Sequence, residues 1–182
     1  MCLLEPEDLQ LRRRLMTDVT RSLAAPHLLG PHDGDVAGES GRQDRFLIHS
    51  RDTDGRFALV EHTLGPRVLA APMHRHTRED EYTFVLEGRV GAILGGREAV
   101  ANAGDLLFKP RGEWHTFWNA GDAPARMLEL ISPAGLEELF RQLGDLSGGS
   151  EPAVLAGMAA GYGCAVDFEA TFPVVQRHGL EF

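Results

Sequence analysis

The chain has 182 residues, of which 43% are hydrophobic and 25% are charged, and its formal net charge is −9. This length fits one domain with short extensions, and the acidic balance argues against a broad nucleic-acid surface and against binding to anionic membranes. The two cysteines, Cys2 and Cys164, are too few for a disulfide framework, and no apolar run reaches the roughly 20 residues of a membrane helix; a cytoplasmic protein is therefore expected.

The first region, residues 1–44, is predicted to be an N-terminal extension. Apolar residues recur at roughly helical spacing over 5–24, which predicts either a docked helix or a frayed arm. Residues 31–41 are rich in glycine and aspartate, so we expect a loop there.

The second region, residues 45–132, is dominated by short β-rich runs bounded by glycine and proline. Strands are predicted at 46–49, 56–64, 82–86, 90–94, 97–101, 105–109, 115–119 and 125–131. Gly95 and Gly96 are typical of a hairpin turn. Many short strands with frequent turns predict a sandwich or barrel, and thus an all-β fold with helical extensions.

The third region, residues 133–182, returns to helical spacing. Leu136, Leu139, Phe140 and Leu143 share one face of a predicted helix over 134–143, with a proline near its start. After a turn at 147–150, weaker helical patterns cover 152–160 and 168–176. We expect a small C-terminal helical appendage.

Four side chains with metal-binding donors fall on the predicted strands. His74 and His76 are two apart in a strand, so both face the barrel interior, and Glu81 opens the next strand, which ends at Gly88. His115 begins a further strand, so three strands bring four donors toward one point. Three imidazoles and one carboxylate suit one divalent Fe, Mn, Ni, Zn or Cu ion better than Ca or Mg.

The two ligand-bearing segments follow a recognisable pattern. Residues 74–88 read H-x-H-x4-E-x6-G, and residues 104–119 read G-x5-P-x-G-x2-H-x3-N. The pair resembles the motifs of the cupin superfamily, over roughly residues 56–131, and over 56–143 if the following helix is included. One departure is Val68, where the family usually has a glycine; Gly65 is the nearest candidate. The resemblance implies a double-stranded β-helix, a jelly-roll-like barrel, with His74, His76, Glu81 and His115 as ligands.

The short spacer and the helix after the barrel also resemble small bacterial cupins that are likened to quercetin dioxygenases. This implies a metal-dependent oxygenase that acts on an enol- or hydroxyl-bearing substrate and O2. Glu81 is then either a ligand throughout or a catalytic base, and the second role needs a pKa raised by the apolar barrel. A non-catalytic metal-dependent binding module and a metal-assisted isomerase or cyclase stay open, because fold does not fix function.

Several other residues have two interpretations each. The candidates for a substrate pocket are equally expected in plain core: Phe84 (if a bulge follows Glu81), Phe117, Asn119 and Met127. His62 is on a strand that could reach the cavity, but a satisfied or exposed histidine is the stronger expectation.

The flanks of the ligands are expected to face outward. Glu79 and Asp80 are predicted to face solvent, and Arg75 and Arg111 lie near the barrel mouth, where surface arginines are common and an anionic substrate is the rarer reason. The two tryptophans beside His115, Trp114 and Trp118, should pack against a sheet, a helix or a partner subunit. Packing against a partner subunit would be compatible with a homodimer.

Overall fold

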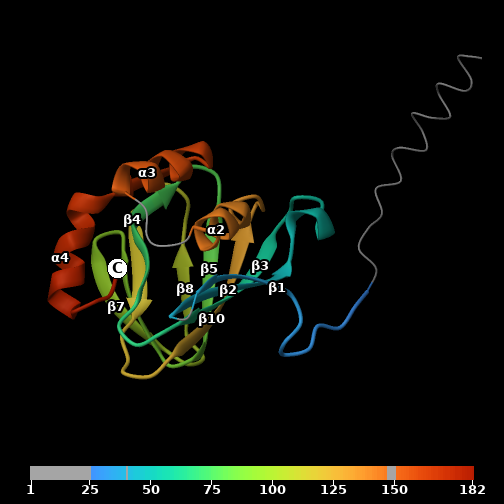
Figure 1. Cartoon of the computed structure of the whole chain (residues 1–182), viewed down its shortest axis with the longest axis horizontal. Coiled ribbons are helices and arrows are strands. Elements are labelled where there is room, and N and C mark those ends of the chain that lie inside the picture. The colour runs from blue at the N-terminus through green and yellow to red at the C-terminus, as the bar shows by residue number, and fades with distance from the viewer. Residues whose placement is uncertain (1–25, 40, 147–150) are drawn as a thin grey trace, which may run out of the picture.

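The computed structural model describes residues 26–39, 41–146 and 151–182, and it contains two antiparallel sheets packed face to face with three short helices (Figure 1). This confirms the expected jelly-roll-like, all-β class with helical extensions. The expectations for residues 5–24 and 147–150 lie outside the described residues. None of the described helices has the length and apolar character needed to cross a bilayer.

The strands alternate between the two sheets, so that neighbours in space are often distant in sequence. The six-stranded sheet runs, in spatial order, β1 (Asp35–Glu39), β2 (Arg42–Ile48), β3 (Ala58–Leu64), β10 (Ala125–Ser132), β5 (Asp80–Glu87) and β8 (Leu106–Lys109). The five-stranded sheet runs β11 (Cys164–Asp167), β4 (Leu69–His76), β9 (His115–Asn119), β6 (Arg89–Leu94) and β7 (Arg97–Asn102). A single 3-10 turn, Ser50–Asp52, follows β2.

Two strands were not expected from the sequence. β1 lies inside the segment 31–41 that was predicted to be a loop, and it pairs along its whole length with β2, from Asp35 opposite Phe46 to Glu39 opposite Arg42. β11 pairs with β4 and places Cys164 opposite His76. Both are edge strands, whose pairing with an existing sheet overrides a weak local preference.

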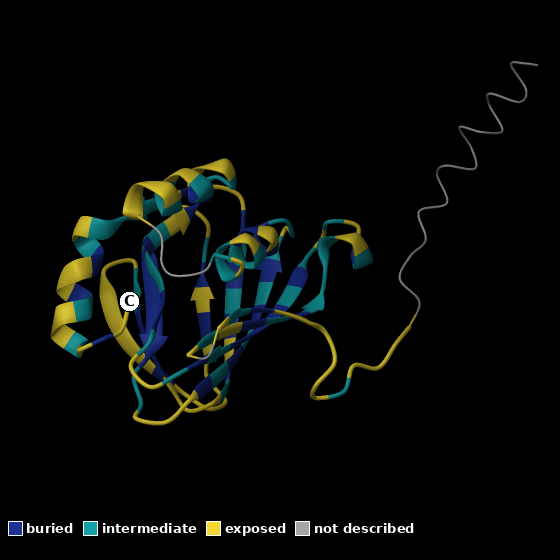
Figure 2. Ribbon diagram, viewed as in Figure 1, coloured by how far each residue is buried: buried dark blue, intermediate teal, exposed yellow. Residues whose placement is uncertain are grey.

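The core between the sheets follows the two-residue period of the strands. Residues of β10 alternate between buried and partly exposed along the whole strand (Figure 2), and its Met127 joins Val85, Val90 and Phe117 in one buried cluster. Gly91 of β6 is required because a Cβ there would lie 2.3 Å from the ring of Trp118. The predicted turn at Gly88 has the expected positive φ of 81°.

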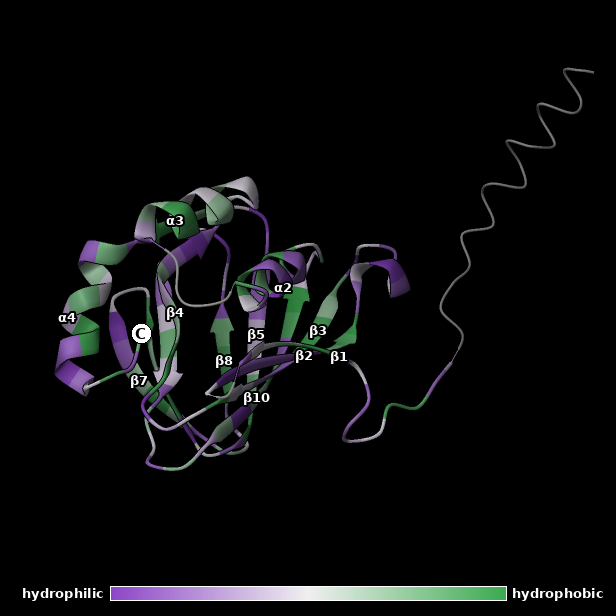
Figure 3. Ribbon diagram, in the orientation of Figure 1, coloured by the Kyte–Doolittle hydropathy of each residue, from purple (hydrophilic) through white to green (hydrophobic). Residues whose placement is uncertain are grey.

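Two helices, α2 (Glu137–Gly144) and α3 (Pro152–Gly161), lie across one end of the barrel (Figure 1). The first begins at Glu137 and not at residue 134 as expected, because Gly135 takes a φ of 130° and its N–H donates to the Glu137 carboxylate. Leu136 and Leu139 pack on Phe46 and other buried residues of the sheet. Most residues of α3 are apolar (Figure 3).

The third helix, α4 (Phe168–His178), covers the outer face of the five-stranded sheet. Trp118 of β9 is buried there against Val174 of the helix and Leu180 beyond it, and its ring lies 4.6 Å from that of His178. Of the three partners considered for this tryptophan, a helix is therefore the one observed. The back of the strand that carries His115 is covered by the chain's own C-terminal part.

Candidate metal centre

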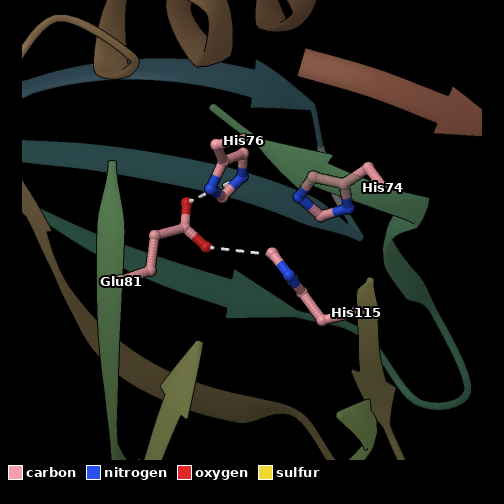
Figure 4. Close-up of side chains that lie close together, drawn as sticks. All are labelled: His74, His76, Glu81 and His115. Carbon is pink, nitrogen blue, oxygen red and sulfur yellow. Dashed lines mark ion pairs between the residues drawn. The ribbon is translucent and has the colours of Figure 1, made fainter. Parts of the chain in front are cut away.

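The four predicted ligands meet inside the barrel. β4 supplies His74 and His76, β5 supplies Glu81 as its second residue, and β9 supplies His115 as its first. Their ligand atoms all lie within 4.8 Å of one another, and the side chains point toward a common centre (Figure 4). The three strands thus bring the donors together as the motif spacing predicted.

Backbone carbonyls orient two of the imidazoles. Nδ1 of His74 lies 2.7 Å from the Pro72 carbonyl oxygen, and Nδ1 of His115 lies 2.9 Å from that of Glu113. When Nδ1 carries the proton, Nε2 has a lone pair that can bind a metal. Nε2 of His76 and Nε2 of His115 are buried without a hydrogen-bond partner. Buried ring nitrogens of this kind are costly unless they gain a partner, so the donor set fits a transition metal.

The protonation states also suit metal ligands. Burial lowers the pKa of His74 well below its ordinary value, and neighbouring His115 and His76 lower it further. Burial likewise lowers the pKa of His76. Neutral imidazoles are the form that binds metals.

Glu81 is an anion in this setting. Its carboxylate oxygens lie 3.6 Å from Nε2 of His76 and 3.5 Å from Nε2 of His115 (Figure 4). Burial alone would raise the pKa of Glu81, but the Lys109 ammonium, His76 and His115 outweigh it and hold the pKa well below its ordinary value. The raised pKa that a base role requires is therefore absent from this arrangement, which favours Glu81 as a ligand.

Lys109 is a buried neighbour of the candidate ligand Glu81 that the sequence did not lead us to expect. It is the only lysine of the sequence, it is 1% exposed, and its Nζ lies 2.7 Å from Glu81 and 2.6 Å from Glu129. Burial would lower the pKa of Lys109, but these two carboxylates raise it above its ordinary value. A signal was present, because Lys109 is two residues from Leu107 and shares its inward face.

A cavity of about 330 Å³ adjoins the ligands. His74, His76 and Glu81 line one part of it, while α2 and α3 contribute an apolar wall that includes Leu139, Phe140 and Leu155. The C-terminal helical region therefore covers part of the space beside the candidate metal ligands. A cavity of this size accepts a small molecule.

The structure places the four candidates for the substrate pocket in different environments. Phe117 lines the cavity. Phe84 does not: it is 42% exposed, because β5 keeps strict alternation after Glu81 and turns Phe84 outward. Met127 belongs to the core between the sheets. Asn119 is buried too, and its amide donates to the carbonyl oxygens of Leu64, Gly65 and Ala123, which ties two loops together.

The acidic residues before Glu81 do not both face solvent. Glu79 is only 1% exposed, which corrects the expectation, and burial raises its pKa. Asp80 is held by Arg111, whose guanidinium donates to it at 2.7 and 3.0 Å and lowers its pKa to about 2.

The two arginines near the ligands have partners on the protein surface. Arg111 pairs with Asp80, and the Arg75 guanidinium lies 4.8 Å from the centre of the Trp114 ring. Neither lines the cavity. An anionic substrate is not needed to explain either residue.

The fold and the site together define a double-stranded β-helix with a possible three-histidine, one-glutamate metal site. A cupin domain model matches residues 60–131. The chain carries a domain of the cupin family over these residues.

Three relatives give the range of proteins that this chain resembles. Quercetin 2,3-dioxygenase of Bacillus subtilis is 29% identical over 122 residues, which cover 67% of this chain and 36% of that protein. The tetracenomycin polyketide synthase protein TcmJ of Streptomyces glaucescens is 35% identical over 81 residues, covering 44% of this chain and 52% of that protein. The polyketide cyclase RemF from Streptomyces resistomycificus superposes with a TM-score of 0.51 at 28% identity, covering 59% of this chain and 80% of that one. The matches span about a third to a half of the two curated relatives.

Proposed function

We propose that this cupin binds one divalent transition metal through His74, His76, Glu81 and His115, and that it catalyses a dioxygenase-like oxidation of a small organic substrate with an enol or hydroxyl group. The observation that carries the proposal is the convergence of four ligand atoms beside a partly open, largely apolar cavity. A bound metal would lower the pKa of a coordinated hydroxyl and hold it beside O2.

The chain's own residues would supply three things around that centre. The backbone carbonyls of Pro72 and Glu113 keep two imidazoles in the ligating tautomer. Lys109 keeps Glu81 ionised. The apolar side chains of α2 and α3 line the cavity, and excluding water from it when a substrate binds would strengthen electrostatic interactions there.

The similarity to quercetin 2,3-dioxygenase supports the oxidative reaction, because it extends over 67% of the chain. The second candidate is a metal-assisted cyclase or isomerase that uses no O2, and it is favoured by the similarities to TcmJ and to the polyketide cyclase RemF. The third is a binding module that holds a ligand on its metal without turnover. The lowered pKa of Glu81 favours the ligand role of this residue under all three.

The test begins with metal-free protein reloaded separately with Fe(II), Mn(II), Ni(II), Cu(II) and Zn(II). Each form is mixed with a panel of flavonols and β-diketones, while O2 consumption and product masses are followed. O2 uptake matched to substrate loss, absent in His115→Ala, supports the dioxygenase. Substrate conversion without O2 uptake would support the cyclase or isomerase. A rise in melting temperature without any conversion would support the binding module.

A further inference from the structure

A row of ionisable side chains crosses the inner face of the six-stranded sheet. It consists of Asp44 on β2, His62 on β3, Glu129 on β10, Glu81 on β5 and Lys109 on β8, which are successive strands of that sheet. Asp44 lies directly opposite His62, and Glu81 lies directly opposite Lys109. The pair formed by the candidate metal ligand Glu81 and Lys109 is thus at one end of a buried polar row, and the Asp44–His62 pair is at the other.

The His62 ring has a hydrogen-bond partner at one nitrogen and none at the other. Its Nδ1 lies 2.7 Å from a carboxylate oxygen of Asp44. Its Nε2 lies 3.6 Å from Glu129, beyond hydrogen-bond range, and has no hydrogen-bond partner although the side chain is only 8% exposed. The residue lines the cavity beside the metal ligands, together with Asp44 and Glu129. A buried polar atom without a hydrogen-bond partner gains from a ligand atom that comes within hydrogen-bond range of it.

The charges around His62 decide whether Nε2 donates or accepts. Burial alone would lower the pKa of His62, and Lys109 opposes protonation as well, but Asp44 and then Glu129 outweigh them and raise it. The pKa of Asp44 is lowered because His62 and Arg42 outweigh its own burial. Asp44 and Glu129 therefore favour the protonated form of His62, and in that form Nε2 carries a proton that it can donate.

Aromatic rings flank this donor. The ring centroid of Phe140 from α2 lies 5.6 Å from that of His62, and the centroid of Phe117 lies 6.1 Å away. Both phenylalanines also line the cavity. Two aromatic rings thus flank His62 on the cavity side, and a flat apolar body is the shape that packs against such rings.

We infer that His62, held by Asp44, is a second substrate-binding group of this cavity and donates a hydrogen bond from Nε2 to an oxygen atom of the substrate. This rests on the proposed function, because the metal holds the other end of the same molecule. The substrate class is a compact, largely aromatic compound with a hydroxyl or enol at the metal and a carbonyl or phenolate oxygen farther along. His62 then selects among metal-binding compounds by their second oxygen.

Two probes with the same metal-binding group separate this role from metal binding. Alizarin carries adjacent hydroxyls and, beyond them, quinone carbonyls, whereas 2,3-dihydroxynaphthalene carries the hydroxyls alone. Dissociation constants of both would be measured by absorbance on zinc-loaded wild type, His62→Phe and His178→Phe. His178 is the matched control, since it contacts Trp118 and Glu98 outside the cavity. Zinc content is measured for every protein.

A charged hydrogen bond of this kind changes affinity by about 10- to 100-fold. We expect that loss for alizarin in His62→Phe alone, with zinc content and 2,3-dihydroxynaphthalene affinity unchanged. An equal effect on both probes, or none on either, with zinc retained, overturns the role of His62 and leaves the metal-based function standing. If wild type holds no zinc or binds neither probe, the proposed function fails and this inference fails with it.

A measurement on the wild type covers the case in which His62→Phe does not fold. Long-range proton–nitrogen NMR of the zinc-loaded protein reports the state of each imidazole nitrogen. The assigned Nε2 resonance of His62 should shift when alizarin is added and stay in place with 2,3-dihydroxynaphthalene. An Nε2 resonance that responds to neither probe, while both bind, overturns the inference.

Discussion

Replacing Lys109 with methionine tests the buried charge arrangement beside the candidate metal ligands. The substitution keeps most of the side-chain volume but leaves Glu81 and Glu129 without the ammonium that lies 2.7 and 2.6 Å from them. Removing one partner of a buried ion pair costs about 3–5 kcal/mol, because the remaining charge stays buried. Glu129 keeps a hydrogen bond from the Thr83 hydroxyl at 2.8 Å. We therefore expect the free energy of unfolding to fall by an amount within that range and not above it.

For a chain of this length, about 1 kcal/mol shifts the melting temperature by roughly 2–4 °C. Metal-free Lys109→Met should therefore melt about 6–20 °C below the wild type, and urea unfolding should show the same loss of free energy. The control is Arg177→Met, which removes the exposed ion pair with Glu98 and should cost less than about 1 kcal/mol.

A double variant separates lost charge pairing from lost packing. In Lys109→Met/Glu129→Gln the second carboxylate is neutralised as well, so part of the stability should return. The reasoning is refuted if Lys109→Met unfolds within about 1 kcal/mol of the wild type. It is also refuted if the double variant is as unstable as the sum of the two single variants.

Four further predictions concern the ligands, the acid–base pair and the helix behind the site. His115→Ala should lose most bound metal, measured by elemental analysis, while its circular dichroism stays that of a folded barrel; full metal occupancy would contradict the four-ligand assignment. Glu81→Gln should retain part of the metal but lose turnover, and unchanged activity would remove Glu81 from the reaction. In metal-free protein, the stability difference between wild type and His62→Phe should be greatest between about pH 3.8 and 6.5, the ordinary pKa values of Asp44 and His62. The stabilising contribution of His62, whose pKa is raised, is lost as the pH rises through its folded-state pKa, and that of Asp44, whose pKa is lowered, is lost as the pH falls through its folded-state pKa. A stability difference that does not change with pH in urea unfolding would contradict this prediction. Trp118→Ala should lower the free energy of unfolding by about 3–5 kcal/mol because the ring is buried under α4. Trp114→Ala should lower it far less, because Trp114 is partly exposed. Equal losses of stability in thermal melts would argue against the docked helix.

The ligand positions were predictable because they depend on local spacing. Side chains two residues apart in a strand lie on the same face, so His74 and His76 share one face. The same alternation places Glu81 and His115 on the inward faces of their strands. The alternation also predicts that Phe84 faces outward, because it lies three positions after Glu81 on an unbroken strand. The bulge that would have turned Phe84 inward does not occur between Glu81 and Phe84, since the irregular register lies farther along, near Arg126.

The polar row could not be predicted in the same way. Its members are neighbours only because β3, β10, β5 and β8 adjoin in an order unlike their order in the sequence. No local period tells which distant strand will pair with which. For the same reason β11 was missed, since a four-residue edge strand is defined by the partner β4 to which it binds.

The enclosure of Lys109 has a practical consequence for measuring how the barrel opens. An amine-acylating reagent has no other lysine to modify, and this one is reached only when strands β5, β8 and β10 separate around it. The rate of acylation at Lys109 therefore reports the opening of the sheet at a single known position. The protein carries its own probe of local unfolding within ion-pair distance of its candidate metal ligand.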